Sequence, residues 1–95
     1  MSRSDVYMVH HLGGYGGEKQ QISNEKAFIE KGFIRCRSEK GDDGKYWEVW
    51  MGYPWMLKGD LENAKAEDIE RWILNHSVGN LDVCKVEKGW GLGVD

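Results

Sequence analysis

The chain has little cysteine, little proline and no long apolar run. Of its 95 residues, two are cysteine and one is proline, and the longest apolar runs cover three or four residues. A membrane-spanning helix needs about 20 apolar residues, and a signal peptide needs an apolar stretch that residues 1–9 lack. Two isolated cysteines are too few for a secreted domain that is stabilised by disulfides, and free thiols suit a reducing compartment. We therefore expect a cytoplasmic protein.

A large excess of positive charge is also missing. The chain has 13 Lys and Arg against 16 Asp and Glu, a net charge of −3. Most nucleic-acid affinity depends on a basic excess, so the sequence argues against direct nucleic-acid binding. The length predicts one domain, residues 1–95, that buries only about 60 to 68% of its unfolded surface. So small a core has no room for a deep cavity, and we expect no cofactor.

The hydrophobic periodicity predicts six elements in the order β-α-β-β-α-β. Ser23 is the expected N-cap of the first helix and Gly32 its exit. Gly41-Asp42-Asp43-Gly44 is a turn signal that predicts a β-hairpin. The expected strands cover residues 5–12, 33–38, 45–53 and 81–86, and the expected helices cover residues 24–31 and 66–77.

This order predicts an α+β fold, a ferredoxin-like βαββαβ sandwich with two helices on one face of a four-stranded antiparallel sheet. Right-handed crossovers would place the first and third strands in the centre and the other two at the edges. Cys36 and Cys84 would then lie on opposite edges. Because a disulfide needs Cα atoms within about 7 Å, we expect no bridge between them.

Aromatic residues are abundant, with five tryptophans and four tyrosines. This exceeds what a small core needs, and aromatic side chains dominate interface energetics. In the third strand, the more continuous apolar face, which we expect against the helices, consists of Trp47, Val49, Met51 and Tyr53. The side without helices then receives Tyr46, Glu48 and Trp50, and from the neighbouring edge strand Phe33, Arg35 and Arg37. The alternative is that a flap of residues 54–64 or the C-terminal tail covers Trp50.

Two further features are expected as secondary contacts. The glycine-rich loop Gly13–Gly17 presents Tyr15, and the start of the second helix carries Glu67 and Asp68. Acidic residues stabilise the N-terminal end of a helix dipole, which is the structural explanation for Glu67 and Asp68. The functional explanation is that an acidic helix edge can occupy a basic groove that a partner uses for nucleic acid.

Motif tests for other functions are weak or negative. The Gly13–Gly17 loop could bind a nucleotide or small ligand through its amides, but it matches no phosphate-binding motif. His10 and His11 would point to opposite faces of a strand, which leaves a small histidine-dependent enzyme as a further alternative and predicts no metal site. Lys45-Tyr46-Trp47-Glu48 lacks the second-position glycine of the RNA-recognition motif.

The sequence therefore predicts a small non-enzymatic protein-binding module of the inhibitor or adaptor type. The expected partner-binding residues are Trp50, Tyr46, Arg35, Arg37, Phe33, Tyr15, Glu67 and Asp68. The partner would be another protein, or a second copy of the chain through the same sheet. The small size and the lack of catalytic motifs suit a viral or mobile-element protein that blocks a host nucleic-acid-processing complex.

Overall fold

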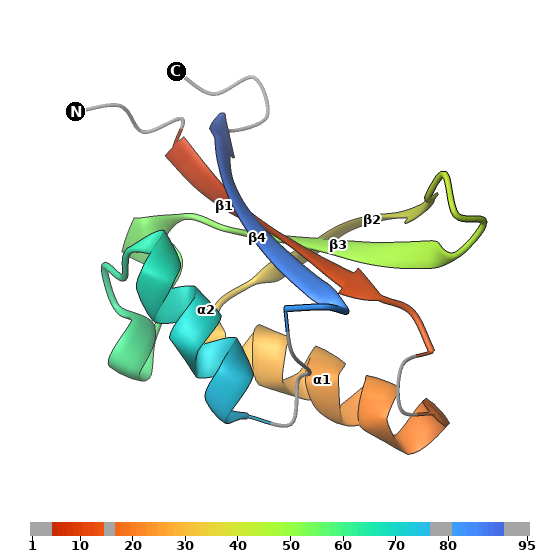
Figure 1. The fold of residues 1–95 in the computed structure, drawn as a ribbon. Helices are drawn as coiled ribbons and strands as arrows, with labels where there is room; N and C mark the ends of the chain where they lie inside the picture. The colour runs from red at the N-terminus through yellow and green to blue at the C-terminus, as the bar shows by residue number, and fades with distance from the viewer. Residues whose placement is uncertain (1–4, 15–16, 77–80, 91–95) are drawn as a thin grey trace.

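The structure, a computed structural model, describes residues 5–14, 17–76 and 81–90. They form an α+β fold with an antiparallel four-stranded open sheet and two α-helices (Figure 1). The strands are β1 (Asp5–Leu12), β2 (Ile34–Lys40), β3 (Tyr46–Gly52) and β4 (Cys84–Trp90), and the α-helices are α1 (Gly17–Lys31) and α2 (Ala66–Asn75). The connection from β3 to α2 contains two short 3₁₀ helices, η1 (Pro54–Met56) and η2 (Gly59–Leu61).

The strand order is β2-β3-β1-β4, so β1 and β3 are central and β2 and β4 are the edges. This is the order expected from right-handed crossovers. Both helices lie on the same side of the sheet (Figure 1). Cys36 and Cys84 lie on the two edge strands and both are free thiols, as expected. None of the described helices is long and apolar enough to cross a membrane.

Helix α1 is about twice as long as expected, because it begins at Gly17 instead of Asn24. Residues 18–21 are Glu, Lys, Gln and Gln, which all favour helix. Ser23 therefore lies inside the helix and does not cap it. Gly32 does end the helix as expected, with a φ of 101° that favours glycine.

The bounds of β4 also differ from the expected residues 81–86. The strand pairs with β1 from the Asp5–Trp90 pair to the His11–Cys84 pair, so the length of β1 sets the length of β4. Residues 81–83 form a turn before it. Strand β1 has the expected bounds, and α2 begins at the expected Ala66 and ends at Asn75. Ser77, the expected end of that helix, lies outside the described residues.

The core lies between the two helices and the sheet, and aromatic rings pack against one another at its centre. Phe28 of α1 is completely buried, and its ring lies 5.8 Å from Trp72 of α2 and 5.4 Å from Trp50 of β3. Tyr7 closes one end, where its hydroxyl donates to the carbonyl oxygen of Ala64 over 2.9 Å. The other buried members are Val9, Phe33, Leu57, Leu61, Ile69, Ile73 and Cys84.

Candidate functional site

Trp50 faces the helices, and the expectation that it lies on the helix-free side of the sheet is wrong. Its side chain is 3% exposed, and it belongs to the core cluster with Phe28. Trp50 pairs with Val9, which is also buried in that core, and residues directly opposite one another share a face. The whole alternation of β3 is therefore reversed relative to the sequence-based prediction.

The reversal has a physical reason in the two neighbours of Trp50 on the same face. A Cβ atom on Gly52 would lie 2.6 Å from the ring of Phe33, so this glycine makes room for a ring from outside the strand. Glu48 is 12% exposed but pairs with Arg35 over 2.8 Å. A glycine and a carboxylate can thus lie on the core side, because other residues fill the space and neutralise the charge.

Phe33 and the two arginines also differ from the expectation. Phe33 is 3% exposed and belongs to the core. A register shift at Cys36 separates the pair Arg35–Trp50 from the pair Arg37–Val49. This extra residue turns Arg35 to the helix side and Arg37 to the opposite side. The Arg35 guanidinium lies 5.3 Å from the centre of the Trp50 ring, on the helix side of the sheet.

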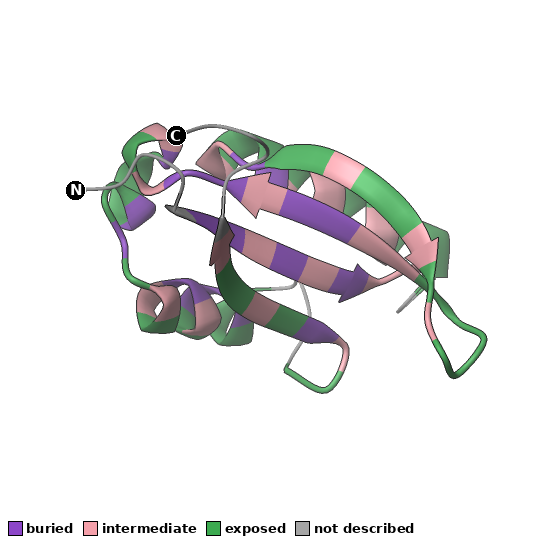
Figure 2. Ribbon diagram, turned by 90° about the horizontal axis from the view of Figure 1, so that it is seen from above, coloured by how far each residue is buried: buried purple, intermediate pink, exposed green. Residues whose placement is uncertain are grey.

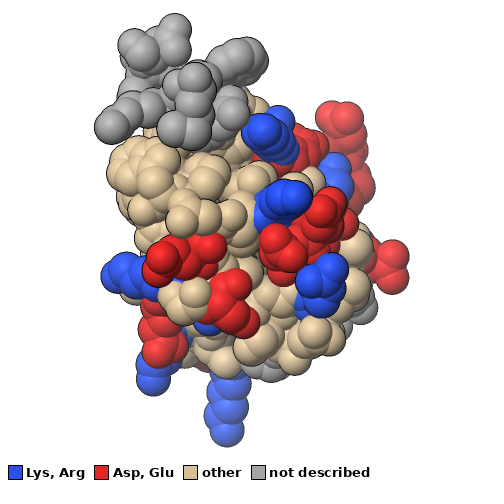
Figure 3. All heavy atoms as spheres, turned by 90° about the vertical axis from the view of Figure 1, so that its left-hand side faces the viewer, with Lys and Arg blue, Asp and Glu red and all other residues tan. Residues whose placement is uncertain are grey.

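Of the remaining expected contact residues that the structure describes, Tyr46 lies at one end of β3, and Glu67 and Asp68 lie at the start of α2. Tyr46 is 61% exposed at the hairpin end of β3, where the ammonium group of Lys40 lies over its ring. Tyr15 lies outside the described residues. Glu67 is exposed on α2, whereas Asp68 accepts a hydrogen bond from the backbone N–H of Lys65 and so stabilises the start of that helix. On the side of the molecule that carries α2, acidic and basic side chains are interspersed (Figure 3).

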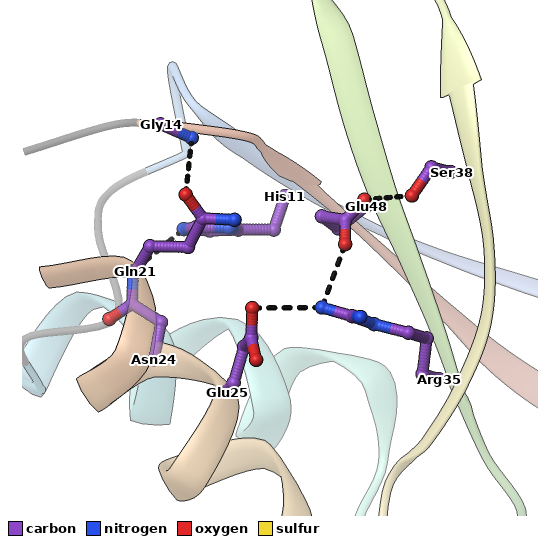
Figure 4. A network of polar contacts seen from close by, with 8 residues as sticks. All are labelled: His11, Gly14, Gln21, Asn24, Glu25, Arg35, Ser38 and Glu48. Carbon is purple, nitrogen blue, oxygen red and sulfur yellow. Dashed lines mark hydrogen bonds and ion pairs between the residues drawn. The ribbon is translucent and has the colours of Figure 1, made fainter. Parts of the chain in front are cut away.

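A polar network fills the space between α1 and the strands on the helix side (Figure 4). Arg35 Nη2 lies 2.8 Å from both Glu25 of α1 and Glu48 of β3, and Ser38 Oγ donates to Glu48. Because Ser38 binds a carboxylate here, it is not arranged as a histidine-activated nucleophile. The network ties the edge strand β2 to α1.

His11 and Asn24 form the buried part of this network, with side chains 2% and 1% exposed. The Asn24 amide nitrogen lies 2.8 Å from His11 Nε2, and the Asn24 oxygen accepts a hydrogen bond from Gln20. Because the amide nitrogen can only donate, His11 Nε2 accepts. His10 points to the opposite side of the sheet, as expected for adjacent residues of a strand.

The face without helices is the best candidate for a functional surface. We call it the open face, because no described helix covers it (Figure 2). Met8, Trp47 and Met51 are half-buried along its centre. Its two edges carry charges of both signs, Arg37 and Glu39 on β2 and Lys85 and Glu87 on β4.

The imidazole ring of His10 lies in the middle of the open face. Its Nδ1 lies 3.6 Å from Glu39 on one edge strand, and its Nε2 lies 3.6 Å from Glu87 on the other. The contact with Glu39 passes over β3 at Val49, the residue paired with His10. This explains why Val49 is completely buried although no helix covers it. The register of β1 and β3 places His10 between Trp47 on one side and Met8 and Met51 on the other.

A hollow of about 550 Å³ lies at the hairpin end of the open face. His10, Glu39 and Trp47 line it from the strands, and the 41–43 turn closes its side. Trp47 packs against that turn, since a Cβ atom on Gly41 would lie 3.1 Å from the indole nitrogen. Lys85 lies 5.9 Å from the centre of the same indole ring. Trp47 is therefore the tryptophan of β3 on the helix-free face, where Trp50 was expected.

The chain matches no protein-family model, no curated protein and no solved structure.

Two other kinds of site receive little support from the geometry. In the glycine loop, the Gly14 amide donates to the side chain of Gln21, and the Gly17 amide donates to the carbonyl of Gly14. These two amides are therefore already engaged and do not point to a phosphate. Within residues 5–14, 17–76 and 81–90, no three histidine, cysteine, aspartate or glutamate side chains could together hold a metal ion.

The two thiols are expected to differ sharply in reactivity. Cys84 is completely buried, and burial raises the pKa of its thiol to about 12. At pH 8 only about one such thiol in ten thousand is ionised, and the thiolate is the reactive form. Cys36 is half-buried at the register shift of β2. Ellman's reagent should therefore modify one thiol of the folded protein and two in urea, whereas equal rates in the folded protein would contradict this burial. A Cys36→Ser variant is the control.

Proposed function

We propose that this domain is a non-enzymatic protein-binding module of the inhibitor or adaptor type, with the open face as its contact surface. The observation that carries the proposal is a helix-free sheet face with half-buried Trp47, Met8 and Met51 at its centre and charges on both edges. Protein interfaces have the same anatomy, an aromatic- and Met-rich centre inside a polar rim. Trp47 takes the role of the central anchor.

The partner we infer is a protein with basic side chains around its contact patch. Asp42 and Asp43 are exposed at the hairpin turn beside the hollow, and Glu87 is 60% exposed on the β4 edge. The whole chain carries a net charge of −3. These carboxylates would steer the open face toward a basic surface. A basic groove of a nucleic-acid-processing complex has this chemistry, which suits a viral or mobile-element inhibitor.

Replacing Trp47 with alanine is expected to weaken partner binding by at least about 30-fold, which corresponds to the roughly 2 kcal/mol of an interface hot spot. The partner is first captured from an extract of the native host and identified by mass spectrometry. Its affinity for the wild type and the variants is then measured with the purified partner by titration calorimetry. Melting temperatures confirm that each variant is folded.

Leu74→Ala is the matched control, because Leu74 is a large apolar residue 54% exposed on α2, which lies on the other side of the sheet from the open face (Figure 1). It should change the affinity by less than about threefold. A second variant, Asp42→Lys, leaves the apolar centre intact and should slow association at low salt. A partner that binds Trp47→Ala as tightly as the wild type would exclude the open face as the contact surface.

We also propose that the sandwich is ferredoxin-like and that the protein works in the cytoplasm. The βαββαβ order and the two central strands β1 and β3 support the first proposal. The free thiols of Cys36 and Cys84 on opposite edges support the second, because they suit a reducing compartment.

A further inference from the structure

Helix α1 carries two isoleucines that the fold does not use. Ile22 is 59% exposed and Ile29 is 60% exposed. They are seven residues apart, so they lie on the same side of α1, about two turns from one another. Glu25 and Lys26 lie between them on that side. We call these four residues the α1 stripe.

The stripe lies away from the helix side that packs on the core. Asn24 and Phe28, the buried residues of α1, point to the sheet and to α2. Single exposed apolar residues are ordinary, but two at this spacing form a line that a second helix can cover.

The stripe has an isoleucine at each end and two opposite charges in the middle, with two residues between each isoleucine and the charged pair. Around a two-fold axis between residues 25 and 26, an antiparallel copy places its Ile29 opposite Ile22. The same rotation places the Lys26 of that copy opposite Glu25. Each contact occurs twice, as a two-fold interface requires. We propose that α1 forms the interface of a homodimer.

A hollow next to the stripe adds shape to this match. It measures about 360 Å³ and lies between α1 and β2, where Ile29 and Ile34 form its rim and Trp50 its floor. Ile34 is 44% exposed. In the antiparallel pair, Ile22 of each copy reaches the other copy beside Ile29 and fills this hollow. Each copy thus offers one apolar knob and one apolar hole.

The charges on the stripe also favour a second copy. Arg35 pairs with two carboxylates, Glu25 and Glu48, so this group of three side chains keeps one negative charge. The Glu25 side chain remains 33% exposed. Lys26 of the second copy would complete the neutralisation, and Lys26 is exposed on the stripe. Opposite charges therefore meet across the axis at both ends of the charged pair.

Sedimentation equilibrium tests the proposal on the full chain. We expect the average mass to rise with concentration from the 10.9 kDa of one chain to twice that value. Ile29→Lys should weaken the dimer by at least about tenfold, because it places charge in the apolar contact. Leu74→Lys is the matched control, since Leu74 is 54% exposed on α2, and it should change dimerisation by less than about twofold.

A charge exchange tests the orientation of the two copies. Lys26→Glu places like charges opposite one another twice and should weaken the dimer by about fivefold or more at low salt. The exchange Glu25→Lys with Lys26→Glu restores opposite charges and should restore the dimer, although it removes the pair with Arg35. Melting temperatures measured at concentrations where the protein is monomeric report the stability lost with the Arg35 pair.

Two results overturn the proposal. One is an average mass that stays at that of one chain up to roughly 1 mM, the concentration at which even weak specific association becomes visible. The other is a dimer that neither Ile29→Lys nor Lys26→Glu weakens, which would place the interface on another face, such as the open face.

Discussion

Trp50→Ala is expected to destabilise the fold by about 3 to 5 kcal/mol. The indole lies at the centre of the core, 3% exposed, between the ring of Phe28 and the guanidinium of Arg35. Its removal leaves a cavity between α1 and β3 that the backbone of neither element can close. The same truncation on a helix-free surface would leave the fold intact.

Urea unfolding followed by far-UV circular dichroism measures this loss, and Trp55→Ala is the control. Trp55 is 59% exposed and stacks on Tyr53 with the ring centres 5.1 Å apart. Its truncation should cost only about 1 kcal/mol or less, because it removes one surface aromatic contact. If both variants lose the same small amount of stability, Trp50 does not fill the core.

The facing of β3 could not be predicted from apolar content alone. Counting apolar residues favours the face of Trp47, Val49 and Met51, because the other face contains Glu48 and Gly52. The structure uses the poorer face, since rings from α1, α2 and the start of β2 supply the missing volume. Those contacts join residues far apart in the sequence. The pattern of one strand cannot reveal them.

The edge strand β2 is a second place where the sequence pattern does not predict which way the side chains point. Its alternating Ile34, Arg35, Cys36 and Arg37 predicts one regular face, and both arginines were expected together. A single unpaired residue at Cys36 reverses the direction of every side chain that follows it. No glycine or proline marks this position. The reversed facing of β3 and this register shift together move the candidate site from Trp50 and Arg35 to Trp47 and His10. The helix-free face of the sheet is still the candidate surface.

The sequence was informative where local rules decide the structure. Crossover handedness gave the strand order, and the Gly41–Gly44 signal gave the hairpin. The hydrophobic periodicity predicted a helix over residues 66–77, and α2 forms there with Ile69, Trp72 and Ile73 on its buried side. These features depend on residues close in the chain or on chirality. The position of Gly32 at the end of α1 belongs to the same group and leads to a further test.

Gly32→Ala is expected to destabilise the fold by about 2 to 5 kcal/mol. Gly32 has a φ of 101°, which a residue with a side chain adopts at a cost of about 1 to 2 kcal/mol. An added Cβ would also lie 2.5 Å from the backbone oxygen of Met56. Relief of this contact needs a shift of the backbone next to Leu57, which is 3% exposed in the core. Overpacking of this kind costs about 1 to 3 kcal/mol more.

Gly44→Ala separates the two causes. Gly44 also has a positive φ, 82°, but no atom lies within 4 Å of the position of an added Cβ. This variant should therefore lose only the backbone contribution of about 1 to 2 kcal/mol in urea unfolding. The difference between the variants measures how tightly the β3–α2 connection packs on the end of α1, where the Lys58 amide donates to the Lys31 carbonyl over 3.0 Å. Equal losses would mean that this connection moves aside freely, and that Leu57 is not held in the core by Gly32.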